Sequence, residues 1–136
     1  MSSYPIEAIE GIGKVYGKKL SAVGITTTGA LLNRAATPKG RRALGEASGI
    51  DDGRILKFAN LADLMRVKGV AIQYSELLEA AGVDTVKELR NRRADNLQAK
   101  MAEVNAAKKL VRAVPSLSAV TKWVAEAKAM KPVLKY

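Results

Sequence analysis

The sequence contains no cysteine and no histidine. Disulfides, thiolate or imidazole metal sites and acid–base catalysis by histidine are therefore excluded. No apolar run is long enough to cross a membrane, and the N-terminal MSSYPIEAIE has neither the basic nor the apolar segment of a secretion signal. We expect a cytoplasmic protein without membrane contact, and one that lacks most of the side chains used in enzyme active sites.

Strand signals are also missing, and aromatic residues make up only 4% of the chain. Hydrophobic residues reach 48% of the 136 residues, which is enough for one compact domain with a real core. Because no stretch alternates between apolar and polar residues, the whole chain is predicted to be α-helical.

Local signals predict where several helices begin and end. Thr37-Pro38 is typical of a helix start, and Ser48-Gly49 of its end. The next helix is expected to begin at Asp51 or Asp52. The other expected boundaries are capping boxes at Thr85 with Glu88 and at Asp95 with Gln98, and a last helix from about Leu117 to Met130.

An internal repeat relates the two halves of the chain. Residues 9–34 and 67–92 align without a gap and share nine identities in 26 positions, where average composition would give roughly two. The sequence therefore predicts two units, 1–66 and 67–136, packed into one compact globule.

Each copy opens with a turn in which glycine alternates with apolar residues. In IEGIGKVYGKKLSAVGI the turn holds Gly11, Ile12 and Gly13, and the helix after it ends at Gly24. Glycine permits positive φ, so the chain can reverse while Ile12 points into the core. The main-chain N–H groups at the turn and the helix start then suit a phosphate oxygen. Gly24 and its counterpart Gly82 are expected to adopt the left-handed conformation that ends a helix.

This stretch resembles the helix-hairpin-helix motif, and VKGVAIQYSELLEAAGV, residues 67–83, resembles a second and weaker copy. Over nearly its full length the chain resembles a bacterial family of tandem helix-hairpin-helix proteins, the domain-of-unknown-function 4332 family. The resemblance implies an all-α fold of the SAM/helix-hairpin-helix-like class, in which duplicated units form one multi-helix domain.

In the wider helix-hairpin-helix class the turn binds the DNA backbone without reading its sequence, and hairpin carbonyls sometimes hold a monovalent cation. For this chain the resemblance implies phosphate contact at Gly11, Ile12 and Gly13. Lys14 follows the turn, and Lys18 lies one helical turn further on. No cofactor other than such a cation is expected.

The second copy departs from this pattern. Its corresponding residues are Lys68, Gly69 and Val70, which the resemblance assigns to the same nucleic-acid contact. Ala71 replaces the second glycine, and Ile72 stands where the first copy has a lysine. A Cβ narrows the freedom of the turn, and an apolar side chain cannot contact a phosphate. A structural or protein-facing role is therefore the alternative for this hairpin.

Positive charge is in excess throughout the chain. The 23 Lys and Arg residues outnumber the 13 Asp and Glu residues, giving a net charge of +10, which attracts polyanions. Each basic cluster alone is typical of a solvated face near a helix end, whereas their shared sign favours a nucleic-acid partner. The clusters outside the hairpins are Lys39, Arg41 and Arg42; Arg90, Arg92 and Arg93; and Lys108, Lys109 and Arg112.

Some helix-hairpin-helix proteins are glycosylases or lyases. Here the glycosylase lysine position holds Val15, and Lys19 matches the lyase position only by register in a lysine-rich chain. We therefore predict a non-enzymatic module that binds the nucleic-acid backbone, with double-stranded DNA as the preferred partner. The alternative is a helical protein–protein interaction or scaffold module with no nucleic-acid role. The oligomeric state is left open.

Overall fold

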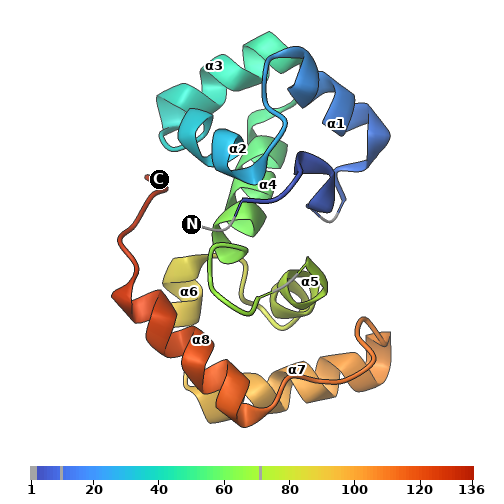
Figure 1. Cartoon of the computed structure of the whole chain (residues 1–136), viewed down its shortest axis with the longest axis vertical. Coiled ribbons are helices and arrows are strands. Elements are labelled where there is room, and N and C mark those ends of the chain that lie inside the picture. The colour runs from blue at the N-terminus through green and yellow to red at the C-terminus, as the bar shows by residue number, and fades with distance from the viewer. Residues whose placement is uncertain (1–2, 10, 71) are drawn as a thin grey trace.

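The computed structural model describes residues 3–9, 11–70 and 72–136, except the side chains of residues 72 and 73. These residues form eight α-helices and one 3-10 helix, with no strand beyond an isolated bridge between Pro5 and Thr27 (Figure 1). The predicted all-α fold is confirmed. The elements are η1 (Ile6–Ala8), α1 (Gly13–Ala22), α2 (Thr28–Arg34), α3 (Pro38–Ser48), α4 (Asp52–Leu64), α5 (Ile72–Ala80), α6 (Val86–Arg90), α7 (Ala94–Lys108) and α8 (Leu117–Ala129).

Five helices begin at a side chain that caps them. In each one a hydroxyl or carboxylate oxygen accepts a hydrogen bond from the N–H three residues further on, the usual N-cap arrangement. Removing such a cap costs a helix about 1 kcal/mol. The capping residues are Thr27, Thr37, Asp51, Thr85 and Ser116.

The start predicted for α7 was wrong. The expected capping residue, Asp95, lies inside the first turn of a helix that already begins at Ala94. Its Oδ1 accepts the N–H of Asn96 at 2.8 Å, and its Oδ2 accepts a hydrogen bond from Arg93 at 2.9 Å. Aspartate is favourable anywhere in the first turn because of the helix dipole, so its presence there does not fix which residue is the cap.

Two helices end in the same conformation. Gly24 follows α1 with φ 87°, and Gly82 follows α5 with φ 96°. The residue after each glycine donates its N–H to a carbonyl five positions earlier, at 2.9 Å and 2.8 Å respectively. This is the Schellman arrangement, which needs a left-handed residue and so favours glycine. The predicted left-handed helix ends at these two positions are confirmed.

The apolar side chains form two clusters that meet at the end of α4. The first is built from η1 and α1 to α4, and Leu134 joins it from the C-terminal segment. The second is built mainly from α5 to α8 and includes Leu64 of α4. The clusters divide close to the predicted boundary between residues 66 and 67. That the two parts are repeats packed into one compact globule stays a prediction.

Corresponding helices pack in corresponding pairs. In the first half α1 packs on α3, and both α2 and α3 pack on α4. In the second half α5 packs on α7, and both α6 and α7 pack on α8. Contacts between α4 and α6 join the two halves. In each half, the last helix is therefore the one on which two other helices of that half pack.

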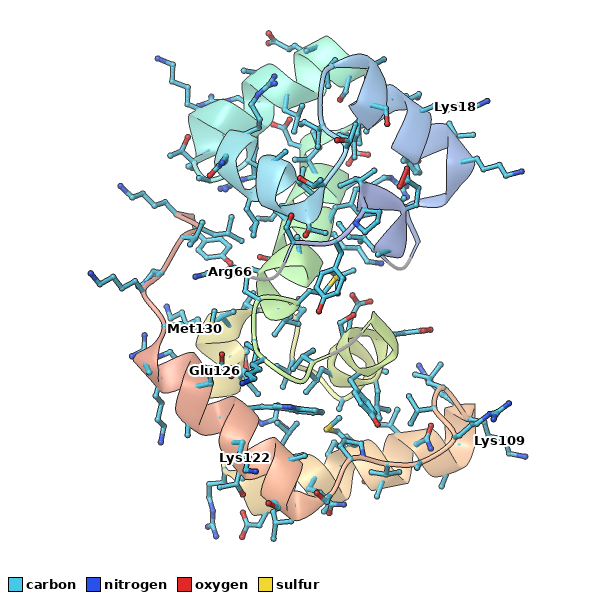
Figure 2. All side chains as sticks on the ribbon, in the orientation of Figure 1. Lys18, Arg66, Lys109, Lys122, Glu126 and Met130 are labelled. Carbon is cyan, nitrogen blue, oxygen red and sulfur yellow. The ribbon has the colours of Figure 1, made fainter. Side chains whose placement is uncertain are left out.

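A buried ion pair lies close to the junction of the two clusters. Nη1 of Arg66 lies 2.7 Å from Oδ1 of Asp63, and Asp63 is only 5% exposed. Burial raises the pKa of the Asp63 carboxyl, a shift that the hydrogen bond and charge of Arg66 only partly counter. Figure 2 places Arg66 between the upper and lower groups of helices.

The C-terminal segment returns from α8 to the first half of the chain. The N–H of Lys135 donates to the carbonyl of Ala36 at 2.7 Å, and the hydroxyl of Tyr136 donates to Oδ1 of Asn60 at 2.8 Å. Leu134 is buried in the first cluster. The two halves are thus joined by this segment as well as by α4.

Arg41 holds the returning segment through hydrogen bonds. Its Nη2 donates to the carbonyl of Lys135 at 2.7 Å, and its Nη1 donates to the carbonyl of Ala35 at 2.8 Å. The residue is 6% exposed, so the solvent-facing position expected for this basic cluster was wrong for Arg41. A guanidinium can be buried in this way because two carbonyl oxygens accept its hydrogen bonds.

Replacing Arg41 with Met should lower the free energy of unfolding by about 3 kcal/mol, because two charged hydrogen bonds are lost and two carbonyls lose their donor. Urea denaturation measures this change. Arg42→Met is the matched control, since Arg42 is exposed on the same helix, and it should change stability by no more than about 0.5 kcal/mol. Equal effects of the two substitutions would contradict the assigned role of Arg41.

Candidate functional site

The first hairpin is a turn in which two glycines have positive φ. Gly11 has φ 86° and Gly13 has φ 61°, and both are exposed. Between them Ile12 is only 1% exposed, and its N–H donates to the carbonyl of Ile9 at 3.2 Å. The turn therefore directs one apolar side chain into the core while its glycines face solvent. The N–H of Ile12 is used within the turn and is not free for a ligand.

The start of α1, which follows this turn, has no side-chain cap. No described residue accepts a hydrogen bond from the N–H of Gly13 or Lys14. A Cβ placed on Gly11 or Gly13 would meet no atom within 4 Å. Two main-chain donors thus lie at the positive end of a helix dipole beside an open surface, an arrangement that favours an anion.

Two exposed lysines follow on the same helix. Lys14 comes directly after the turn and Lys18 one helical turn later, where it projects from α1 into solvent (Figure 2). Neither has an ion-pair partner among the described residues. Val15, which sequence reasoning left out of the site, is 64% exposed beside them. The sequence gives little signal for it, because a lone apolar residue on a helix is usually assigned to the core.

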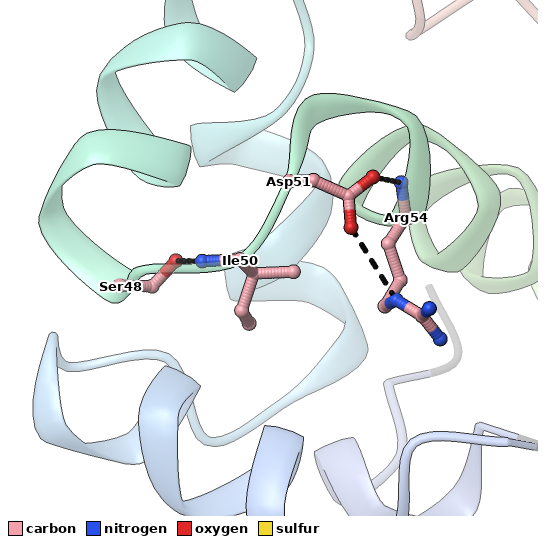
Figure 3. A network of polar contacts seen from close by, with 4 residues as sticks. All are labelled: Ser48, Ile50, Asp51 and Arg54. Carbon is pink, nitrogen blue, oxygen red and sulfur yellow. Dashed lines mark hydrogen bonds and ion pairs between the residues drawn. The ribbon is translucent and has the colours of Figure 1, made fainter.

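A further cation lies against α1 from α4. The guanidinium of Arg54 is 4.8 Å from the centre of the Tyr16 ring, and Nζ of Lys19 is 5.8 Å from it. Asp51 positions Arg54 by accepting its main-chain N–H at 3.1 Å, with the other carboxylate oxygen 3.4 Å from Nε (Figure 3). Tyr16 is half-buried and its ring centre lies 5.7 Å from that of Phe58, as expected for a packing residue with a polar tip. Arg54 could not be assigned to this surface from sequence, because α4 is distant along the chain.

The described part of the second hairpin repeats the conformation of the first. Gly69 has φ 91°, Val70 is 1% exposed, and the N–H of Val70 donates to the carbonyl of Val67 at 3.0 Å. The positive φ of Gly69 corresponds to that of Gly11, and the hydrogen bond from Val70 to Val67 corresponds to the one from Ile12 to Ile9. The substitution at Ala71 lies outside the described residues, as does the side chain of Ile72.

What differs is the surface that faces the second turn. Oε2 of Glu126, which Figure 2 labels on α8, accepts the N–H of Lys68; the distance between the two atoms is 3.0 Å. A Cβ on Gly69 would come within 2.9 Å of Nε1 of Trp123, which is also on α8. Trp123 is buried against the ring of Tyr74, with ring centres 5.4 Å apart. At this hairpin a carboxylate of the fold accepts the N–H of Lys68, the residue before the turn glycine, and the Trp123 indole lies against Gly69.

The other basic residues are divided between surface and interior. Arg90 and Arg92 are partly buried, whereas Arg93 is exposed and bonded to Asp95. The remaining members of the clusters are exposed, namely Lys39, Arg42, Lys108, Lys109 and Arg112.

Within the described ranges no three Asp or Glu side chains gather where they could hold a metal ion. No helix in the same ranges is both long and apolar enough to cross a membrane.

Alanine substitution of Gly11 and of Gly69 should distinguish the first hairpin, which faces open space, from the second, against which α8 packs. Gly11→Ala should cost about 1–2 kcal/mol, the price of a left-handed residue with a side chain. Gly69→Ala should cost more, because its Cβ would also approach the Trp123 indole at 2.9 Å. Chemical denaturation measures the free energy of unfolding of both variants. Equal losses of stability would show that α8 does not pack tightly against Gly69.

The family described as "Domain of unknown function (DUF4332)" matches residues 10–130 of the chain. This range includes both hairpins and all eight α-helices. The chain matches no curated protein and no solved structure. Because the match covers most of its length, the chain belongs to the family of proteins with this domain of unknown function, DUF4332.

Proposed function

We propose that this protein is a non-enzymatic module that binds the phosphate backbone of nucleic acid, with duplex DNA as the preferred partner. The observation that carries the proposal is the uncapped start of α1, where the N–H groups of Gly13 and Lys14 and the side chains of Lys14 and Lys18 have no partner among the described residues. Main-chain donors and lysines recognise phosphate without reading bases, so the binding is independent of sequence.

The helix arrangement supports a tandem helix-hairpin-helix architecture. Each hairpin buries its central apolar residue and leads into a helix that ends at a left-handed glycine. The next helix in both halves is capped by a threonine, Thr27 in one and Thr85 in the other. We interpret the halves as two copies of one unit, of which the first retains an open anion site.

We expect the first hairpin to contact the phosphate, because a carboxylate of the protein itself already lies at the second hairpin. Glu126 accepts the N–H of Lys68, so a negative charge of the fold lies beside this turn and would repel a phosphate. The net charge of +10 adds long-range attraction for a polyanion, which raises association rates and falls with salt.

Lys14→Glu should weaken binding to duplexes of unrelated sequence to the same degree. The slope of log affinity against log salt should fall by about 1, since each neutralised phosphate contributes about 0.9. Gly13→Val should also weaken binding, because Gly13 has φ 61° and its amide would be displaced. Fluorescence anisotropy at several salt concentrations measures both effects.

Lys39→Glu is the control, since it makes the same charge change at an exposed lysine of another helix. It should alter affinity much less than Lys14→Glu. If the three variants bind alike, or if the wild-type affinity does not depend on salt, the first hairpin is not a phosphate site.

A protein-interaction role is the second candidate. It is favoured by the packing of α8 against the second hairpin, which leaves that hairpin less suited to a phosphate. Affinity capture from lysate after nuclease digestion separates the two candidates. If nucleic acid is the partner, digestion should remove all bound material. A protein that stays bound after digestion, and is lost in a variant of an exposed residue such as Val15→Glu, would instead support the interaction module.

A further inference from the structure

A groove of about 690 Å³ lies between the corner that joins α6 to α7 and the side of α8. Cations enter it from three segments: Arg90 from the end of α6, Arg92 and Arg93 from the link, and Lys128 from α8. Leu117, which is 49% exposed, and Ala125 contribute apolar surface to the same groove. We refer to this site as the α6–α8 groove.

The charge of the α6–α8 groove is poorly balanced. Asp95 is the one carboxylate among its lining residues, and it is paired with Arg93 at 2.9 Å. Within the described part of the chain, Arg90, Arg92 and Lys128 have no carboxylate partner. A concave surface lined by charges of one sign concentrates their field and attracts counter-ions.

Folding alone does not account for all of these cations. Arg90 and Lys128 lie in the last turns of α6 and α8, where the helix dipole stabilises positive charge. Arg92 and Arg93 lie in the link between the end of α6, whose dipole favours positive charge, and the start of α7, whose dipole disfavours it. Arg93 is paired with Asp95, whereas an anion bound in the groove would neutralise Arg92.

The occupant that fits best is a chain of phosphates rather than a single small anion. The cations come from separate segments along the groove and do not converge on one buried polar group. Exposed apolar surface between them suits the sugars of a nucleic-acid backbone. Charge complementarity therefore favours a polyanion, in agreement with the net charge of the whole chain.

We propose that the α6–α8 groove is a second binding surface for the nucleic-acid backbone and that one molecule can hold two nucleic-acid segments. This extends the proposed function of the first hairpin and rests on it. The first hairpin leads into α1 at the upper right of Figure 1, whereas α6 and α8 lie at the lower left. Because the two surfaces belong to different halves and different sides of the molecule, each can engage its own segment.

The test uses the full chain with two duplexes, one immobilised on beads and the other fluorescent and free. Wild-type protein should retain the fluorescent duplex on the beads. Arg92→Glu combined with Lys128→Glu should still bind a single duplex but should lose most of this bridging. The salt slope of total binding should fall by about 2, which corresponds to two lost phosphate contacts.

Controls separate the groove from general charge effects and from misfolding. The neutral pair Arg92→Gln with Lys128→Gln should lose bridging in the same direction, without adding repulsive charge. The matched pair Lys108→Glu with Arg112→Glu makes the same charge change at two exposed residues outside the groove and should keep bridging. Circular dichroism melting and light scattering check that all variants are folded and have the same mass.

The outcomes distinguish this proposal from the first one. If Lys14→Glu weakens binding and the groove variants bridge like wild type, the groove proposal is overturned and the hairpin stands. If the groove variants lose bridging and binding while Lys14→Glu has no effect, the groove binds nucleic acid and the hairpin does not, so the two-segment proposal is overturned. Equal losses in the groove pair and the matched control pair would also overturn it.

Discussion

The left-handed conformation of one glycine in each half is the constraint on which the rest of the structure depends. At Gly11 and Gly69 the chain adopts a φ near 90°, a conformation that is unfavourable for residues with a Cβ atom. Only this conformation turns the chain so that the next residue, Ile12 or Val70, enters the core at 1% exposure. The helix that follows then starts at the surface without a capping side chain in the first half. Core packing and open main-chain donors are thus consequences of one turn.

The turns at Gly11 and Gly69 have different environments, because α8 packs against the second turn whereas open space faces the first. Over Gly11 there is open space, whereas over Gly69 the side of α8 brings Trp123 and Glu126. The internal carboxylate is chemically similar to the ligand that we propose for the first hairpin, because both present anionic oxygen to a main-chain N–H. At the second hairpin this oxygen comes from the fold itself and is bonded to Lys68, the residue before the turn glycine.

Features that depend on a few neighbouring residues could be predicted from the sequence. Thr37-Pro38 and the left-handed Gly49 bound α3 as expected, and Gly24 and Gly82 end their helices in the predicted conformation. The start of α7 was misplaced because aspartate is stabilising at several positions of a first turn, so Asp95 did not identify the cap.

Features that depend on distant segments could not be predicted in this way. Arg41 seemed a surface cation because its neighbours are polar, and only the returning C-terminal segment shows why it is buried. Glu126 is 58 residues from Lys68, and no local pattern links them. The α6–α8 groove likewise exists only after α8 has packed on α6 and α7, although its arginines are adjacent in sequence.

The returning C-terminal segment has a mechanical consequence. The chain leaves the first cluster through α4, builds the second cluster, and then re-enters the first at Leu134 and Lys135. With two attachments instead of one, the halves cannot hinge about the end of α4 unless the Arg41 and Ala36 hydrogen bonds break. The second attachment therefore opposes a change in the angle between the two halves.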